Sequence, residues 1–497
     1  MPARMLTTNK REPGAFSGVV YALLAALFLL SRLVYLMAGV GFDSDPLLSS
    51  LALLDPELLR NDLARSILYL HGQPPLFNLF VGLLLKLFGS HVFIVARILY
   101  MSMGLLITLT MQIMLSRWNV PLYLSLPLTI GFTVAPSTVL FENLLFYTYP
   151  LTLLLLLGVL CLDSYLRTDQ IRFAWLFFAF LGIIVLTRSL FHPLWYVLVA
   201  AALIALRRQQ RKMLLAAASI PLLLIALWAA KNAILFGSGG SSTWLGMSLS
   251  KMITVGVPTQ ERVSLVNSGD ISPFALRHPF EGIDEYRDLL SPRDSTGIPV
   301  LDMEVRTTGN MNLNNLAYLE ISRHSMSDAL TLIRMYPLTY LRGIVHAAFI
   351  FFRPASEYVS LYRDRPQIAW IDRPVNLVIL GQWRYERSGF EDNSSPIDYA
   401  FQIERTGVFI AILYIIVFVW SFRNVIVCAG SADRGDSQHL LAMFLLSTIL
   451  YVATVGNLAE IGENCRFRFM VDPLFIMLFA LLLKQLIDRA GGREASP

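Results

Sequence analysis

The chain has 497 residues, of which 55% are hydrophobic and only 15% are charged, and its mean hydropathy is +0.58. Soluble domains carry about 25% charged residues, so this much apolar surface cannot be hidden inside a soluble core. The net charge of +5 does not indicate nucleic acid, because Lys and Arg gather at the ends of apolar segments, as in Arg207–Lys212. We therefore expect a protein embedded in the lipid bilayer, with no nucleic-acid partner.

Apolar runs near the length that crosses a bilayer, about 20 residues, recur along the chain and give about eleven candidate spans. The sequence therefore predicts an all-α, polytopic transmembrane helical bundle of about eleven spans. The candidates cover about 15–40, 74–88, 91–115, 119–135, 139–163, 171–187, 190–206, 212–235, 404–427, 438–456 and 469–487.

Basic residues predict the orientation of the chain. Arg4, Lys10, Arg11 and the Arg207–Lys212 cluster belong on the cytoplasmic side, which places loop 41–73 outside. An even number of full crossings between that loop and the cluster would contradict both assignments. We therefore expect one of the two shortest candidates, 74–88 or 119–135, to re-enter or to cross only partly.

The predicted spans divide the chain into three parts. Residues 1–235 form an amino-terminal transmembrane module that includes the long outer loop 41–73, and residues 404–497 hold the last three spans. Residues 236–403 between them are too long for a simple connector, so we expect a large outer region. Within it, the apolar stretch 336–352 carries Arg342 and predicts an interfacial or lid helix.

Two carboxylates follow the first span directly. Asp43 and Asp45 belong to the segment in which the first predicted helix leaves the membrane. A carboxylate at that level could act as a general base on a hydroxyl, a role typically worth about 10²–10⁴-fold in rate. The simpler alternative is that these residues and Asp55 only solvate the loop or cap a helix.

Other polar side chains are expected near the same membrane surface. His71 and Gln73 close the first outer loop before Pro74–Pro75, which suits the first turn of a helix. Glu142 and Asn143 lie in an apolar context where an unpaired carboxylate is costly. They predict either a substrate cavity or an ion pair between helices, and His71 either binds a ligand or fastens the loop.

Arrangement and short motifs together resemble the GT-C superfamily of membrane glycosyltransferases. Its members include protein O-mannosyltransferases, the aminoarabinose transferase of lipid A and lipopolysaccharide-core sugar transferases. Residues 15–235 carry most of the likeness, which is weaker after Gly237. The matching features are Asp43 after the first span, an amphipathic run before His71 and Pro74–Pro75, Leu186-Thr187-Arg188 at a span end, Lys231-Asn232, and Arg466-Phe467-Arg468 before Asp472-Pro473.

The resemblance implies an inverting transfer of sugar from a polyprenyl- or dolichyl-phosphate carrier to a cell-envelope glycan, a lipid or a protein. It implies Asp43 as the base, with Asp45 as its rival. Arginine forks suit phosphate oxygens, so Arg188 is the first candidate for the donor phosphate, followed by Arg466, Arg468 and His71. The two later arginines could instead only reach the membrane interface.

The remaining expectations concern cofactors, location and alternatives. We expect no tightly bound metal, although an Asp-x-Asp triplet can hold a divalent ion. The compact outer region favours the bacterial inner membrane, with the site facing the periplasm or exterior. A transporter or flippase of lipid-linked glycans and an O-antigen polymerase or ligase are the alternative functions. Glu142, Asn143, Asp55 and Gln73 are the expected cavity residues beside the catalytic aspartates.

Overall fold

The computed structural model describes residues 15–385, 405–430 and 437–491 of the chain. Within these ranges the chain is helical and no β-strand occurs, which confirms the all-α prediction. The described chain contains two isolated β-bridges, and one of them joins Asp43 to Leu144. The basic residues Arg4, Lys10 and Arg11 lie outside the described residues.

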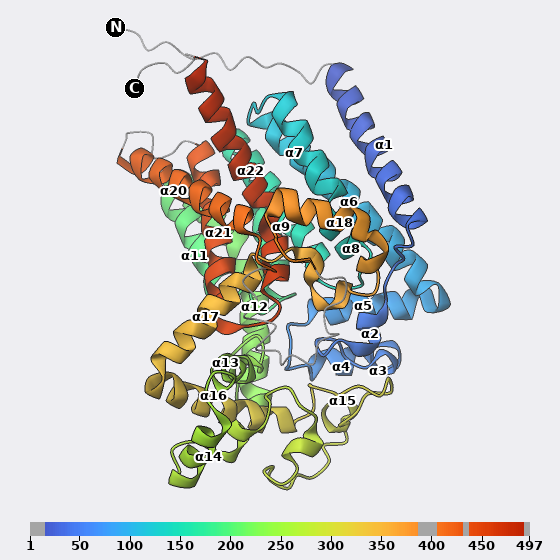
Figure 1. The fold of residues 1–497 in the computed structure, drawn as a ribbon, viewed down its shortest axis with the longest axis vertical. Helices are drawn as coiled ribbons and strands as arrows, with labels where there is room; N and C mark the ends of the chain where they lie inside the picture. The colour runs from blue at the N-terminus through green and yellow to red at the C-terminus, as the bar shows by residue number, and fades with distance from the viewer. Residues whose placement is uncertain (1–14, 386–404, 431–436, 492–497) are drawn as a thin grey trace.

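A bundle of long helices forms one part of the molecule (Figure 1). The most enclosed of its long apolar helices is α9, which packs against α6, α10, α21 and α22. The bundle helices are α1 (Ala15–Met37), α5 (Leu76–Phe88), α6 (Val92–Arg117), α7 (Leu122–Val134), α8 (Pro136–Glu142), α9 (Thr148–Thr168), α10 (Ile171–Val185), α11 (Pro193–Leu206), α12 (Arg211–Phe236), α20 (Val408–Gly430), α21 (Ser437–Ala459) and α22 (Asn464–Ala490).

Seven helical segments of the described chain are long and apolar enough to cross a membrane, or eight if α7 and α8 form one bent span. This confirms a multi-pass membrane protein with fewer full-length spans than the eleven expected. One segment, Leu76–Arg117, holds both α5 and α6, with the chain turning at Gly89 (φ +49°). Figure 1 shows α5 lying across the bundle and α6 running along it. The apolar helices α10, α11 and α17 (Pro337–Phe351) are shorter, with 15, 14 and 15 residues.

A proline explains the bend between α7 and α8. Ala135 is extended (φ −59°, ψ 139°), as is typical of a residue before proline, and Pro136 then starts α8 at 53° to α7. After α8 the chain meets the first loop, because the Asp43 N–H donates to Asn143 O (2.6 Å) and the Leu145 N–H donates to Asp43 O (2.9 Å). The predicted 119–135 segment thus continues through α8 to the end of the bundle that carries Asp43.

The first loop and the outer region join into a cap over that end of the bundle, opposite the first residues of α1 and the last turns of α22 (Figure 1). The outer region has two small apolar cores of its own, one around Tyr318 and one around Leu332. The helices of the cap are α2 (Asp45–Ser49), α3 (Pro56–Asn61), α4 (Leu63–Leu68), α13 (Leu245–Thr254), α14 (Thr259–Ser268), α15 (Pro299–Asp302) and α16 (Ala317–Met335).

Asp55 holds the two halves of the cap together. Its carboxylate caps α3 by accepting from Glu57 N (2.9 Å) and also accepts from the backbone and hydroxyl of Thr307 (2.5 and 2.7 Å). Arg306 donates to the carbonyls of Leu48 (2.8 Å) and Leu53 (3.1 Å). Asp55 therefore serves as a helix cap and a bridge between segments, a capping role that is typically worth about 1 kcal/mol.

Candidate functional site

A cavity of about 1000 Å³ lies where the cap meets the ends of the bundle helices. All three predicted parts of the chain contribute to its wall, so it exists only in the folded protein. Its polar wall includes the neutral side chains of Gln73, Tyr147 and Tyr358. The ionisable side chains that line it are Asp43, Asp45, Arg188, His192, Lys251, His278, Arg363, Glu460 and Glu463.

Asp43 is held in the wall of this cavity by the backbone on either side of it. The residue is only 8% exposed, and its Oδ1 accepts from Asp45 N (2.8 Å) and from Arg363 Nη1 (3.1 Å). Within the described residues Oδ2 accepts no hydrogen bond, so it remains able to take a proton. Burial raises the pKa of the Asp43 carboxyl above its ordinary value, in spite of the hydrogen bond from Asp45 and the charge of Arg363.

Arg363 is a cavity residue that the sequence did not single out. Its guanidinium bridges Asp43 and Asp45 (3.3 Å to Asp45 Oδ2) and remains 56% exposed. Asp364 accepts a hydrogen bond from Gly41 N (3.1 Å). Arg363 and Asp364 therefore contact the first loop both before and after Asp43. The only sequence signal was the charged run Arg363-Asp364-Arg365, which lies far from the first loop along the chain.

Arg365 anchors that segment in the protein interior. Its fully buried guanidinium donates to Asp372 (2.7 Å) in α18 (Ala369–Val375) and to Glu357 (3.3 Å). A buried cation with two carboxylate partners is stable only while the partners are in place. The anchor thus fixes where Arg363, two residues earlier, meets the aspartates.

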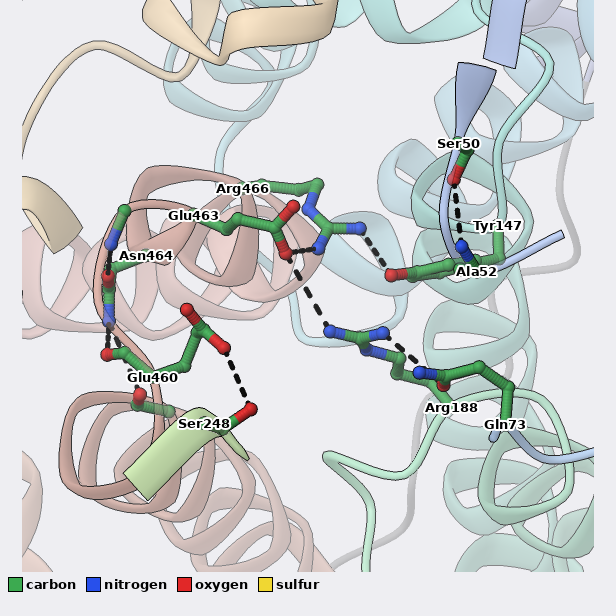
Figure 2. A network of polar contacts seen from close by, with 12 residues as sticks. Ser50, Ala52, Gln73, Tyr147, Arg188, Ser248, Glu460, Glu463, Asn464 and Arg466 are labelled. Atoms are coloured by element: carbon green, nitrogen blue, oxygen red, sulfur yellow. Dashed lines mark hydrogen bonds and ion pairs between the residues drawn. The ribbon is translucent and has the colours of Figure 1, made fainter. Parts of the chain in front are cut away.

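Arg188 enters the cavity from the end of α10. Its Nη1 lies 3.5 Å from Gln73 Oε1, its Nη2 lies 3.8 Å from Glu463 Oε2, and its guanidinium stands 4.9 Å from the ring centre of Tyr147 (Figure 2). Both polar contacts are long, and the buried Nε has no hydrogen-bond partner among the described residues. The guanidinium therefore has donor capacity left for an anion in the cavity.

Arg466 stands behind the cavity wall. Its side chain is buried, donates to Tyr147 Oη (2.6 Å) and pairs with Glu463, which it shares with Arg188 (Figure 2). Burial alone would raise the pKa of Glu463, but Arg466 and Arg188 lower it below its ordinary value. Glu463 is therefore ionised and orients both arginines, so the loop before α22 is both an internal charge network and part of the cavity.

Like Arg466, two further predicted phosphate ligands, His71 and Arg468, lie outside the cavity lining. His71 is fully buried, its Nδ1 contacts Thr243 Oγ1 (2.9 Å), its Nε2 contacts Asn314 O (3.0 Å), and burial lowers its pKa to about 3. This neutral histidine fastens the first loop to the outer region. Arg468 donates to the carbonyls of Phe351 (3.3 Å) and Arg353 (2.9 Å). Neither residue is among the phosphate ligands that we propose.

Glu142 belongs to an ion pair between helices. Arg32 of α1 donates to both of its oxygens (2.9 and 2.6 Å), and Tyr149 donates to Oε2 (2.9 Å). Gly104 of α6 makes room for the pair, because a Cβ there would lie 2.0 Å from Glu142 Oε2. Glu142 and Asn143 line a separate small cavity of about 30 Å³ and not the large one. Glu142 was expected either in a substrate cavity or in an ion pair between helices, and the structure shows the ion pair.

Replacing Glu142 by glutamine should destabilise the protein by about 3–5 kcal/mol, because it leaves the buried Arg32 charge without its partner. The measurement is thermal unfolding of the full chain in detergent. The double variant Arg32→Gln/Glu142→Gln is the matched control, and it should recover part of the loss. Equal stability of wild type and Glu142→Gln would show that the pair does not hold α1 in place.

Among the residues that the structure describes, no group of three or more His, Cys, Asp or Glu side chains is arranged to hold a metal ion. The Asp-x-Asp pair is bridged by Arg363 instead.

No protein-family model matches the chain, and no curated protein or solved structure matches it significantly. Fold and site together define a multi-pass helical membrane protein with a polar cavity at one end of the bundle.

Proposed function

We propose that this protein is a membrane glycosyltransferase that moves a sugar from a polyprenyl-phosphate carrier to an acceptor hydroxyl. One observation carries the proposal: a buried, basic carboxylate, Asp43, and an arginine with unused donor capacity, Arg188, line the same cavity. Transfer from a lipid phosphate needs both groups, a base for the acceptor and a cation for the departing phosphate.

The short helices α10 and α11 suit a donor that stays in the membrane. At 1.5 Å per residue, the 15 residues of α10 span about 22 Å, less than the roughly 30 Å of a hydrocarbon core. The helix begins beside the basic end of the bundle, where Arg207 pairs with Asp169 (3.8 Å). Arg188, just past its other end, then lies at the depth of a lipid headgroup or slightly below it.

In the proposed reaction the acceptor hydroxyl gives its proton to Asp43 Oδ2 while its oxygen attacks the anomeric carbon. The bond from that carbon to the phosphate oxygen breaks on the opposite face, so the configuration inverts. The lipid phosphate leaves with the bonding electron pair, and Arg188 offsets the charge that develops on it. Glu463, Gln73 and Tyr147 keep the guanidinium in position.

The alternative functions place polar groups differently. A transporter or flippase of lipid-linked glycans commonly binds its substrate near the bilayer midplane between repeated halves. Here the cavity lies at the ends of the helices and under a cap, which favours an enzyme at the interface. An O-antigen polymerase or ligase would also act there, but would not depend on Asp43. We further propose the bacterial inner membrane, with the cavity facing outward.

The test is reconstitution of the full chain in vesicles that contain radiolabelled lipid-phosphate sugars from a bacterial membrane extract, together with envelope glycans as acceptors. The expected result is a labelled product together with free lipid monophosphate. Movement of intact labelled lipid across the membrane, without cleavage, would instead establish the transporter. Mass spectrometry of the product identifies the sugar and the acceptor.

The pH profile of this transfer should follow the Asp43 carboxyl. A base must be deprotonated, so activity falls as the pH drops through its raised pKa. Arg363 lowers that pKa, so Arg363→Gln should move the acid limb of kcat/KM to higher pH. Asp45 raises it, so Asp45→Asn, which keeps the backbone hydrogen bond, should move the limb to lower pH. Shifts of the same sign in both variants would remove Asp43 as the titrating group.

A further inference from the structure

The cavity has two kinds of exposed rim. Two exposed lining residues are large and apolar: Leu194 of α11 is 56% exposed and Leu245 of α13 is 50% exposed. Two others are charged and paired with each other, Arg363 and Asp45, with side chains 56% and 61% exposed. The cavity therefore has an apolar mouth, defined by Leu194 and Leu245, and a polar mouth, defined by Asp45 and Arg363.

The apolar mouth continues into a lipid-facing stripe. Leu198, one turn along α11 from Leu194, is 58% exposed, and Ile234 near the end of α12 is 81% exposed. Large apolar side chains exposed on neighbouring helices mark contact with a membrane or partner, because exposing apolar surface to water costs about 25 cal/mol per Å². Since α11 and α12 are apolar bundle helices that pack together, the bilayer covers this stripe.

Between the apolar mouth and Arg188 the wall is mostly apolar, with Ser189 and His192 as polar lining residues. Leu190 lies at the α10–α11 turn, and Val455, Gly456 and Ala459 of α21 face the same space. The Tyr451 hydroxyl ties α21 to this turn, accepting from His192 N (2.9 Å) and donating to Leu190 O (2.8 Å). A hydrocarbon chain along this wall would bring an attached headgroup to the guanidinium.

From these contacts we infer that the apolar mouth between Leu194 and Leu245 seats the hydrocarbon chain of a lipid phosphate whose phosphate lies on Arg188. The polar mouth between Asp45 and Arg363 then admits the acceptor from the aqueous side, beside Asp43. This inference rests on the proposed function for the identity of the headgroup. Beyond that function, it specifies where the hydrocarbon tail lies. It also specifies that the donor enters from the membrane and that the acceptor hydroxyl enters from water.

The test uses the full chain in vesicles of phosphatidylethanolamine and phosphatidylglycerol. The probe is a hexadecyl phosphate that carries a photoreactive diazirine in its chain, and the matched probe is the hexadecanol analogue without phosphate. After illumination, digestion and mass spectrometry, we expect the phosphate probe to label residues 190–194 and the peptide that holds Leu245 at least about tenfold more than the alcohol. That factor is the size expected from one charge-assisted contact.

Three variants and two competitors serve as controls. Arg188→Ala should remove the excess, and Leu194→Glu should reduce it about tenfold, the loss expected when one apolar wall contact becomes polar. Leu198→Glu, exposed on the same helix but outside the cavity lining, should leave it unchanged. Inorganic phosphate at the same concentration should not compete, whereas unlabelled hexadecyl phosphate should.

Excess labelling around Val359 and Arg363, or equal labelling by both probes, would overturn the assignment of the mouths. The readout involves no sugar transfer, so it separates this inference from the function. If the chain binds the lipid phosphate at Leu194 but transfers no sugar, the lipid site is supported and the transferase function is refuted. If the chain transfers sugar but the probe labels another region, the function is supported and the lipid site is refuted.

Discussion

Asparagine in place of Asp43 should lower kcat/KM for sugar transfer by about 10²–10⁴-fold, the usual contribution of a general base. The amide keeps the shape of the side chain and can still accept at Oδ1 from Asp45 N and Arg363, so the loop should hold its conformation. What the variant loses is the basic oxygen, Oδ2, that accepts no hydrogen bond in the described residues. The measurement is initial-rate transfer in the reconstituted vesicles.

Asp45→Asn is the matched control for this variant. It removes a carboxylate from the same cavity and the same arginine, but this carboxylate is 61% exposed and further toward water. The loss of kcat/KM in Asp45→Asn should stay within about tenfold, since an exposed charge at the rim acts mainly through weak, screened interactions with neighbouring charges. Full activity of Asp43→Asn, or a larger loss in Asp45→Asn, would move the catalytic role to the second aspartate.

Removal of the Arg188 guanidinium is the second change with a large expected effect. Arg188→Ala should lower kcat/KM by about 10²–10³-fold, comparable with the loss of one donor to a developing anion. Glu463 keeps its pairing with Arg466, so the wall should not collapse. Arg188→Lys should recover only part of the rate, because a point charge cannot reproduce the planar fork. Transfer kinetics and labelling by the hexadecyl phosphate probe measure the two effects.

Lys251→Gln provides the comparison for Arg188→Ala. Lys251 also lines the cavity, but it pairs with Glu460 and lies on the cap side of the cavity. Its loss should leave labelling by the lipid phosphate probe unchanged. If Arg188→Ala and Lys251→Gln reduce labelling equally, the cavity attracts anions by its overall charge and Arg188 is no specific ligand.

The predicted site and the observed cavity agree for residues whose place depends on where a helix ends. Asp43, Asp45, Gln73 and Arg188 all follow or precede an apolar helix, and all line the cavity. Ends of packed helices gather at the two faces of a bundle, so their polar residues share a level in the membrane. That level can be predicted from hydropathy without knowledge of which helices are neighbours.

Partners could not be predicted in the same way. The Asp43–Arg363 contact joins segments 320 residues apart, and no local pattern marks it. Glu142 had two possible readings, and only the position of Arg32 beside it decided for the ion pair. His71 was predicted either to bind a ligand or to fasten the loop, and both of its ring nitrogens contact protein atoms, of Thr243 and Asn314. Each outcome depended on a side chain from a distant segment.

The number of full-length spans shows the same limit. An apolar run reports that a segment avoids water, but its length alone does not say whether it crosses, bends or lies across the bundle. The turn at Gly89 and the extended Ala135 before Pro136 gave segments 74–88 and 119–135 their different courses.

Composition alone predicts a helical membrane protein, because the polar backbone of an apolar segment finds no hydrogen-bond partners in lipid and a helix satisfies these groups locally. Packing between distant segments decided the rest: which polar ends face one another, which charges are neutralised and where the cavity opens. Local backbone bonding can be read along one segment, whereas burial and ion pairing are properties of the assembled chain.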